Sequence, residues 1–184
     1  INWGKTFYPA QHYVLVVWNH GNGWRRGVER NYPTRAVSYD DEFGTSIQTW
    51  ELAQAIGNNH FDMIAWDASL MQMIEVAHEI KDQADYIVGS EESPPGAGYP
   101  YDLIFAKFRD NPDDTPLNLS KSFVDGMLQG YASDNLAKIT QSVIDTAQLS
   151  NLATQVDGLA QVLIANQGSL GALVPSVRAN AKSY

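Results

Sequence analysis

The chain has 184 residues, of which 44% are hydrophobic, and it carries a formal net charge of -9. This length and apolar content suit a buried core, so we expect residues 1–184 to form a single domain. The acidic balance argues against nucleic acid as a partner, because proteins that bind it concentrate Lys and Arg against the phosphates. The chain contains no cysteine, which excludes disulfides and thiolate metal sites. No apolar run approaches the roughly 18 residues of a membrane-spanning helix, so we expect no membrane segment.

Three apolar, β-rich runs in the first half of the chain predict buried strands of a parallel sheet. They cover residues 12–18, 60–66 and 86–88. Each run leads into a loop that is rich in glycine or in chemically active side chains, and these loops cover residues 19–23, 67–69 and 89–98.

The segments between the first two runs predict a loop and a helix. Residues 25–44 are polar and irregular, which indicates a long exposed loop. Residues 45–56 place Ile47, Trp50 and Ile56 at helical spacing, which indicates an amphipathic helix that ends at a glycine. After the second run, we expect a helix to begin near Ser69.

The second half of the chain is mainly helical in pattern. We expect one helix at residues 120–131, a strand at 136–139 and a last helix at 149–167. In the last helix, apolar residues recur every three or four positions and define one apolar face. Such a face predicts a helix that is packed against the core rather than a linker.

Strands that alternate with helices predict an α/β sandwich with a mostly parallel sheet. Ligands of such sheets bind in the crevice at the carboxyl ends of the strands. The loops that hold His20, Ser69 and Gly98 all follow strands, so we expect one crevice to contain all three loops.

His20, Gly21 and Ser69 are the first candidates for chemistry, and each has a structural alternative. A histidine after a strand is more often structural than catalytic, but Gly21 beside it leaves its backbone N–H open to an oxyanion. Ser69 lies where a strand meets the expected helix, so it could be a nucleophile or an ordinary N-cap.

Two long strings in the chain resemble the signature blocks of the clostripain-like cysteine peptidases. They are VLVVWNHGNGW and FDMIAWDASLMQMIEVAHEIKDQADYIVGSEESPPGAGYPYD. The first block of that family carries the catalytic histidine followed by glycine, and the second carries Asp-Ala-Cys-Leu-Met with the nucleophile at its centre. The resemblance covers residues 8–102 well and the later helices more loosely, and it implies the caspase-like fold, a three-layer sandwich.

The resemblance implies a role for each matching residue. His20 would be the general base or ion-pair partner, Ser69 would stand at the nucleophile position, and the N–H groups of Gly21 and Ser69 would form the oxyanion hole. Asp67 would lie at the floor of the pocket that selects Arg or Lys, since a carboxylate binds a guanidinium through paired hydrogen bonds. The structural alternative for Asp67 is a helix N-cap. Glu91 and Ala97 would be further substrate-binding positions.

The sequence departs from the family's pattern at two of these positions. Ser69 replaces the cysteine, and a hydroxyl ionises far less readily than a thiol, so we expect this chain to be inactive. We favour an engineered substitution over a natural variant as its origin. Ala97 stands where family members often carry aspartate, which weakens the argument for strict basic specificity.

The segment between His20 and Ser69 also holds candidate processing and metal residues. Relatives are commonly activated by self-cleavage after a basic residue in this interval, and the four candidates here are Arg25, Arg26, Arg30 and Arg35. The alternative is an ordinary solvated loop. No cofactor is expected; calcium stays open because some relatives use it, and Asp40, Asp41 and Glu42 could ligate it, although their spacing matches no EF-hand.

The sequence therefore supports a leading hypothesis and two alternatives. The leading one is an endopeptidase domain that cleaves peptide or protein substrates after Arg or Lys. The alternatives are a non-catalytic module that binds basic peptides, and a working serine hydrolase. The N-terminus shows no signal-peptide layout and begins at Ile1 like the end of an earlier element, so we expect a fragment of a longer chain. By resemblance alone, we expect a secreted or cell-envelope bacterial protein.

Overall fold

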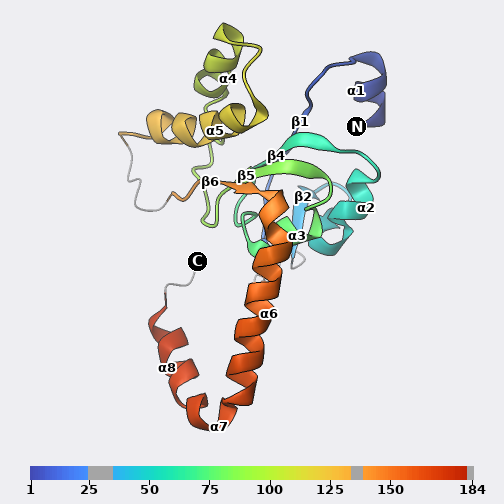
Figure 1. The fold of residues 1–184 in the computed structure, drawn as a ribbon. Helices are drawn as coiled ribbons and strands as arrows, with labels where there is room; N and C mark the ends of the chain where they lie inside the picture. The colour runs from blue at the N-terminus through green and yellow to red at the C-terminus, as the bar shows by residue number, and fades with distance from the viewer. Residues whose placement is uncertain (25–34, 134–138, 182–184) are drawn as a thin grey trace.

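A four-stranded sheet forms the centre of the computed structural model, which describes residues 1–24, 35–133 and 139–181 (Figure 1). The strands lie in the order β1-β4-β5-β6. The first three run parallel and β6 is antiparallel to β5, so the sheet is mostly parallel, as predicted. The strands are β1 (Val14–Trp18), β4 (Phe61–Asp67), β5 (Ala84–Gly89) and β6 (Ser142–Asp145).

Side chains from the middle of the sheet are buried on both faces. Along β4, Ile64 and Trp66 pack into one core cluster, while Met63 and Ala65 pack into another. This alternation follows from the two-residue period of a strand, and burial on both faces explains the continuous apolar run in the sequence. The three strand predictions in the first half of the chain are thus confirmed.

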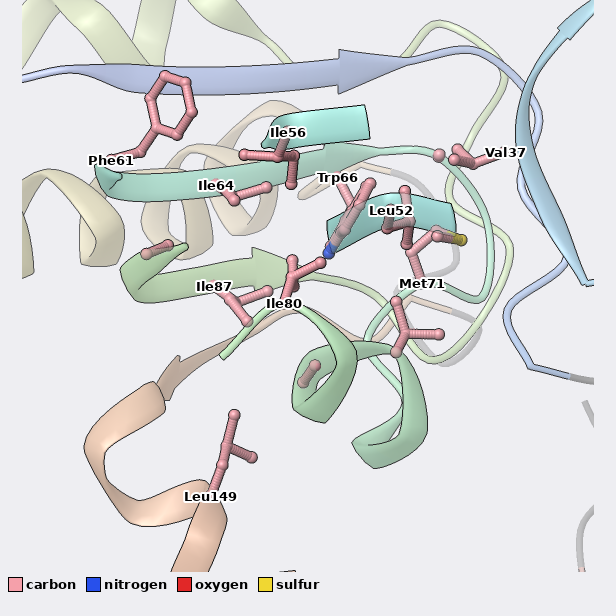
Figure 2. Packing of buried hydrophobic residues seen from close by; sticks show 14 residues of the cluster. Val37, Leu52, Ile56, Phe61, Ile64, Trp66, Met71, Ile80, Ile87 and Leu149 are labelled. Carbon is pink, nitrogen blue, oxygen red and sulfur yellow. The ribbon is translucent and has the colours of Figure 1, made fainter. Parts of the chain in front are cut away.

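Helices cover the two faces. The first cluster combines Trp66 and Ile87 of the sheet with Leu52 and Ile80, which come from α2 and the end of α3 (Figure 2). The second combines Met63 with Ile104 of α4 and Phe123 of α5. These helices are α2 (Leu52–Ile56), α3 (Ile74–Glu79), α4 (Tyr101–Asp110) and α5 (Pro116–Gly130). A short exposed helix, α1 (Asn2–Phe7), precedes β1.

A hairpin replaces much of the loop and helix predicted at residues 25–56. Strands β2 (Ala36–Asp40) and β3 (Thr45–Gln48) pair antiparallel, and a 3-10 turn (Thr49–Glu51) leads into α2. The helical turn begins only after Gln48, whose backbone N–H bonds the Glu51 carboxylate at 3.0 Å in a capping box. The buried Val37 shows why β2 is held in place. Residues 25–34 of the predicted loop lie outside the described residues. Over residues 36–48, the predictions of a loop and of a helix from residue 45 were wrong, because pairing between the two strands overrode the local pattern.

The expected helix at Ser69 is also wrong. The chain stays irregular after β4, and α3 begins only at Ile74. Leu70 has φ 63, a left-handed conformation that no helix continues through. Instead, the backbone N–H of Gln72 bonds Ser90 O at 3.2 Å, which ties this segment to the loop after β5. Ser69 is therefore neither an N-cap nor a residue in the field of a helix terminus.

In the second half of the chain, the predicted helix at 120–131 is confirmed but begins earlier. Thr115 caps α5 by accepting the Asn118 N–H at 3.2 Å, and Pro116 occupies its first turn. The structure has its last strand at Ser142–Asp145, whereas residues 136–138 of the predicted strand lie outside the described residues.

The last predicted helix exists, but its apolar face is not packed. After a 3-10 turn (Thr146–Gln148), α6 (Leu149–Ala165) extends away from the sheet, followed by α7 (Gln167–Leu170) and α8 (Leu173–Asn180) (Figure 1). Leu149 is buried, but Leu159 is 60% exposed. The prediction of a packed helix was therefore wrong beyond its first turn. Among the described helices, none is long and apolar enough to span a membrane.

Candidate active site

The carboxyl ends of β1 and β4 bring two of the sequence's candidate segments to one edge of the sheet. Trp18 of β1 pairs with Asp67 of β4 in the parallel ladder, so the two strands end at the same level of the sheet. His20 follows Trp18 by two residues, and Ser69 follows Asp67 by two.

A hollow of about 400 Å³ opens at this edge, and it contains His20, Asp67 and Ser69 together. Its remaining walls come from the ends of β1 and β4, the β2–β3 turn and the loop after β5: Trp18, Asn19, Asp41, Ala68, Pro94, Pro95, Gly96 and Gly98. An imidazole, a hydroxyl and a carboxylate therefore share one solvent-accessible space. A second hollow of about 330 Å³ has mainly apolar walls, including Val14, Met63 and Phe108. It also contains His12 and Asp62, but these two side chains are bonded to each other at 2.6 Å, and no hydroxyl of a described Ser, Thr or Tyr lines this hollow.

Two glycines let the His20 loop pack directly on the Ser69 segment. A Cβ atom on Gly21 would lie 2.6 Å from Ser69 O, closer than real Cβ atoms approach. Gly23, with φ +55, would place a Cβ 2.7 Å from Met73 Sδ and against Leu70 O. Because side chains at either position would separate the two loops, the close approach depends on glycine.

The pairing of this loop with β2 also determines where the Gly21 amide points. Gly21 lies opposite Val37 in an antiparallel bridge. The flanking bonds run from Ser38 N–H to His20 O at 3.2 Å and from Asn22 N–H to Ala36 O at 3.0 Å. Gly21 is therefore the non-hydrogen-bonded member of the ladder, and its own N–H points away from β2.

The N–H groups of Gly21 and Ser69 donate no hydrogen bond to any other described residue. Gly21 is buried, and buried backbone donors are almost always paired with an acceptor. Two amides on loops in close contact are thus open to an acceptor supplied by a ligand. This arrangement can stabilise a negatively charged oxygen.

Strained backbone precedes the exposed His20. Asn19 has φ 126, outside the ordinary range of a residue with a side chain. It is held there by bonds from its backbone N–H to Asp67 O at 3.3 Å and from its amide Nδ2 to Tyr39 O at 3.0 Å. Such strain persists where several contacts together fix one backbone conformation. Here the fixed conformation of Asn19 determines the direction in which the chain continues into His20.

Asp67 is held firmly at the floor of the hollow. It is 6% exposed, and its Oδ2 accepts a bond from the Tyr101 hydroxyl at 2.8 Å and from the Tyr99 N–H at 3.3 Å. Gly98, with φ +74, packs so closely that its Cβ would lie 2.9 Å from the same oxygen. Asp67 caps none of the described helices, and α3 after it begins only at Ile74, so the alternative interpretation as an N-cap is wrong.

Further hydrogen bonds fix the position of Tyr99, which in turn holds Asp67. The buried Tyr99 hydroxyl donates to Trp66 O at 2.9 Å and accepts from Gln141 Nε2 at 2.8 Å. Burial, together with the nearby Asp67 carboxylate, raises the pKa of Tyr99, so its hydroxyl stays protonated at neutral pH. The loop after β5 is further tied to Thr140, whose hydroxyl bonds Ser90 Oγ at 3.0 Å.

The other two candidate substrate-binding residues, Ala97 and Glu91, are less closely associated with the hollow than Asp67. Ala97 is exposed, between two glycines that line the hollow. Glu91 is exposed too, but it does not line the hollow, and its N–H bonds Thr140 Oγ1 at 3.0 Å.

Of the candidate processing residues, Arg25, Arg26 and Arg30 lie outside the described residues. Arg35 is half-buried, with its guanidinium 5.4 Å from the centre of the Trp24 ring. Its carbonyl accepts the Thr49 N–H at 2.7 Å.

The acidic segment considered for calcium closes the β2–β3 turn. Asp40 Oδ1 accepts the N–H groups of Glu42 at 3.0 Å and Phe43 at 3.1 Å. Within the described part of the chain, no group of three His, Cys, Asp or Glu residues is placed to hold a metal ion.

Sequence reasoning missed several residues of the site. Trp18 was treated only as part of a strand, and Asp41 only as a possible calcium ligand in a loop, although both line the hollow. Tyr99 and Tyr101 lie in the quoted family string, but their roles in holding Asp67 depend on contacts across 32 and 34 positions of the chain. No local pattern in the sequence signals those contacts.

A mostly parallel sheet between helices, with this hollow at its carboxyl edge, places the protein in the class of caspase-like folds, and solved structures agree. The chain is similar to a secreted C11 cysteine protease from Bacteroides thetaiotaomicron in complex with an irreversible peptide inhibitor, with a TM-score of 0.65 and 29% identity. It is also similar to an inactive zymogen C11 protease from Parabacteroides distasonis, with a TM-score of 0.62 and 26% identity. These matches cover 82% and 83% of this chain.

The sequence profile of the clostripain family matches residues 1–184, and the chain belongs to this family of cysteine peptidases. Clostripain of Hathewaya histolytica is 31% identical over 136 residues, which cover 64% of this chain. The match spans 25% of clostripain, and the structural matches span 44% and 39% of the two solved chains. The chain thus corresponds to less than half the length of these relatives.

Proposed function

We propose that this chain is the catalytic part of an endopeptidase that cleaves after Arg or Lys through a Cys–His pair, and that Ser69 at the nucleophile position makes this form inactive. The observation that carries the proposal is the shared hollow of His20, Asp67 and Ser69, with Gly21 packed on the Ser69 backbone. Membership of a cysteine peptidase family supports the reaction class.

In the proposed mechanism, His20 takes the proton of the nucleophile and later returns it to the leaving amine. The attacked carbonyl oxygen becomes negatively charged and accepts bonds from the N–H groups of Gly21 and Ser69. The open amides of both residues support this role. Water then hydrolyses the acyl-enzyme and regenerates the nucleophile.

The basic side chain of the substrate would bind Asp67. A buried carboxylate attracts a cation strongly, because the low dielectric of the surroundings strengthens the charge interaction. Asp67 is 6% exposed and lines the hollow, which supports this assignment. Ala97 and Glu91 would contribute less, since both are exposed.

The expected inactivity rests on the chemistry of serine. A cysteine thiol with a pKa of about 8.5 readily gives a thiolate beside histidine, whereas a serine hydroxyl does not ionise near neutral pH. A shorter C–O bond also moves the attacking atom within a site that otherwise suits sulfur. Both effects lower the rate of nucleophilic attack on the peptide carbonyl.

The first prediction is that Ser69→Cys restores peptidase activity. A fluorogenic peptide ending in Arg or Lys before the dye should be cleaved by Ser69→Cys at a rate about a thousandfold or more above the parent chain. Adding His20→Ala to Ser69→Cys is the control and should abolish the gain. A folded Ser69→Cys protein that cleaves neither peptide would contradict the proposal.

The same Ser69 supports the alternative of a non-catalytic module that binds basic peptides. Calorimetry with such a peptide distinguishes the two: binding with no turnover in either the parent or Ser69→Cys favours the module. Labelling of Ser69 in the parent by a fluorophosphonate would instead favour a serine hydrolase. The codon of the parent gene at this position decides whether serine is natural.

We also propose activation by self-cleavage and export from the cell. Among the relatives, one structure is described as a zymogen and another as a secreted protease. The candidate cleavage sites are Arg25, Arg26, Arg30 and Arg35, between the His20 and Ser69 segments. Mass spectrometry should find Ser69→Cys cut after one of them and the parent chain intact.

A further inference from the structure

Among the described residues, the two donors that bind the Asp67 carboxylate bind the same oxygen. The Tyr101 hydroxyl and the Tyr99 N–H each donate to Oδ2, at 2.8 and 3.3 Å. Within the described part of the chain, Oδ1 accepts no hydrogen bond from another residue. The two oxygens of this carboxylate are therefore inequivalent toward a ligand in the hollow.

The Tyr101 hydroxyl is held in place by its ring. Tyr101 is the first residue of α4, and its ring stacks on Phe105 with centroids 5.9 Å apart and meets Tyr99 edge-on at 5.9 Å. Burial and the bond to Asp67 raise the pKa of Tyr101, so the hydroxyl remains a donor at neutral pH. Oδ2 thus accepts two hydrogen bonds from the protein in this structure.

Among the described residues that line the hollow, Asp67 is the one buried carboxylate. Gly98 has no side chain, and Ala97 has only a methyl group. Asp41 lines the hollow from the β2–β3 turn, but it is exposed, so its attraction for a cation is screened by water. A basic side chain that reaches the floor thus meets one free carboxylate oxygen.

Lysine and arginine differ in what they require of a carboxylate. A guanidinium presents a planar fork that pairs best with two oxygens, whereas an ammonium is a compact charge that one oxygen can satisfy. A guanidinium bound to Oδ1 alone would form only one of the two parallel hydrogen bonds that its fork makes with a free carboxylate, which costs binding energy.

We propose that Tyr101 is a positioning residue that limits Asp67 to one available oxygen and so makes the site prefer lysine over arginine. The inference rests on the proposed function, since it refines which basic side chain the hollow accepts. Tyr101 acts through Asp67 and does not itself touch the substrate.

Calorimetry on the parent chain tests this with three peptides that differ only in the residue before the scissile bond: Lys, Arg or norleucine. The Lys peptide should bind about threefold to tenfold more tightly than the Arg peptide. In Tyr101→Phe, which frees Oδ2 while keeping the stacked ring, the Lys-to-Arg ratio should fall by threefold or more. Tyr13→Phe is the matched control and should keep the parent ratio, because its hydroxyl contacts Tyr8 O and the Ala10 N–H instead.

The outcomes separate the inference from the proposed function. If norleucine binds as well as Lys and Arg, the basic preference itself fails. If basic peptides bind but Arg is preferred in the parent, or Tyr101→Phe leaves the ratio unchanged while circular dichroism shows it folded, the role of Tyr101 is refuted. In Ser69→Cys, the same substitution should shift the Lys-to-Arg ratio of kcat/KM mainly through KM.

Discussion

Single glycine residues determine how closely the loop that carries His20 approaches the segment that carries Ser69. Gly21 is not in a left-handed conformation, so its requirement for glycine comes from contact alone. Its Cα faces Ser69 O and the Met71 side chain, and the backbone oxygen cannot move without displacing the Ser69 segment. The position of the Ser69 segment relative to His20 therefore depends on the absence of a side chain at Gly21.

We expect Gly21→Ala to destabilise the protein by about 1–3 kcal/mol, because the added methyl forces the two loops apart. In the Ser69→Cys background it should also reduce kcat/KM at least tenfold. Chemical denaturation and peptidase kinetics measure the two effects. Gly158→Ala is the matched control, since nothing lies within 4 Å of its added Cβ and alanine favours the helix. Equal stability of the two variants would show that the loops tolerate the methyl group.

At the scale of elements, α6 combines a buried start with an exposed apolar remainder. Leu149 packs into the same cluster as Ile80 and Ile87, whereas Leu159, farther along the same helix, is exposed. Helical periodicity is the same at both positions. The two positions differ because only Leu149 has a neighbouring element to pack against. Shortening the side chain should therefore change the free energy of unfolding strongly at one end of the helix and weakly farther along it.

Leu149→Ala should therefore cost about 2–5 kcal/mol, the range for a buried leucine that leaves a cavity. Leu159→Ala on the same helix should change the free energy of unfolding by no more than about 0.5 kcal/mol. Urea titrations of both variants provide the comparison. A large loss in Leu159→Ala would mean that this face is covered in solution.

At the scale of the whole molecule, the two ends of the parallel strands carry different groups of polar side chains. The carboxyl ends carry the candidate active site, while the opposite ends carry a hydrogen bond between His12 Nδ1 and Asp62 Oδ1 at 2.6 Å. Burial alone would raise the pKa of Asp62, but bonds from the Tyr13 N–H and the His12 ring outweigh it and hold the pKa below its ordinary value. Asp62 thus joins the starts of β1 and β4 through its ionised form.

The lowered pKa of Asp62 determines the sign of its effect on stability. An acid whose pKa is lower in the folded state stabilises the fold above its unfolded pKa and loses this contribution as pH falls through the folded value. Asp62→Asn should therefore be less stable than the parent at pH 7, and the difference should shrink below about pH 4. Denaturant titrations at pH 7 and pH 3 test this, and a difference that is equal at both pH values would contradict it.

The sequence by itself determined the three buried strands, the α/β class and the segments that meet at the site. Continuous apolar runs and the two family-like strings are local features, so they could be recognised without coordinates. The hairpin at residues 36–48, the irregular chain around Ser69 and the exposure of α6 were decided only by tertiary structure. So was the pairing of Tyr101 and Tyr99 with one oxygen of Asp67. Each of these depends on which distant segment supplies a contact, and such contacts leave no period or spacing in the chain.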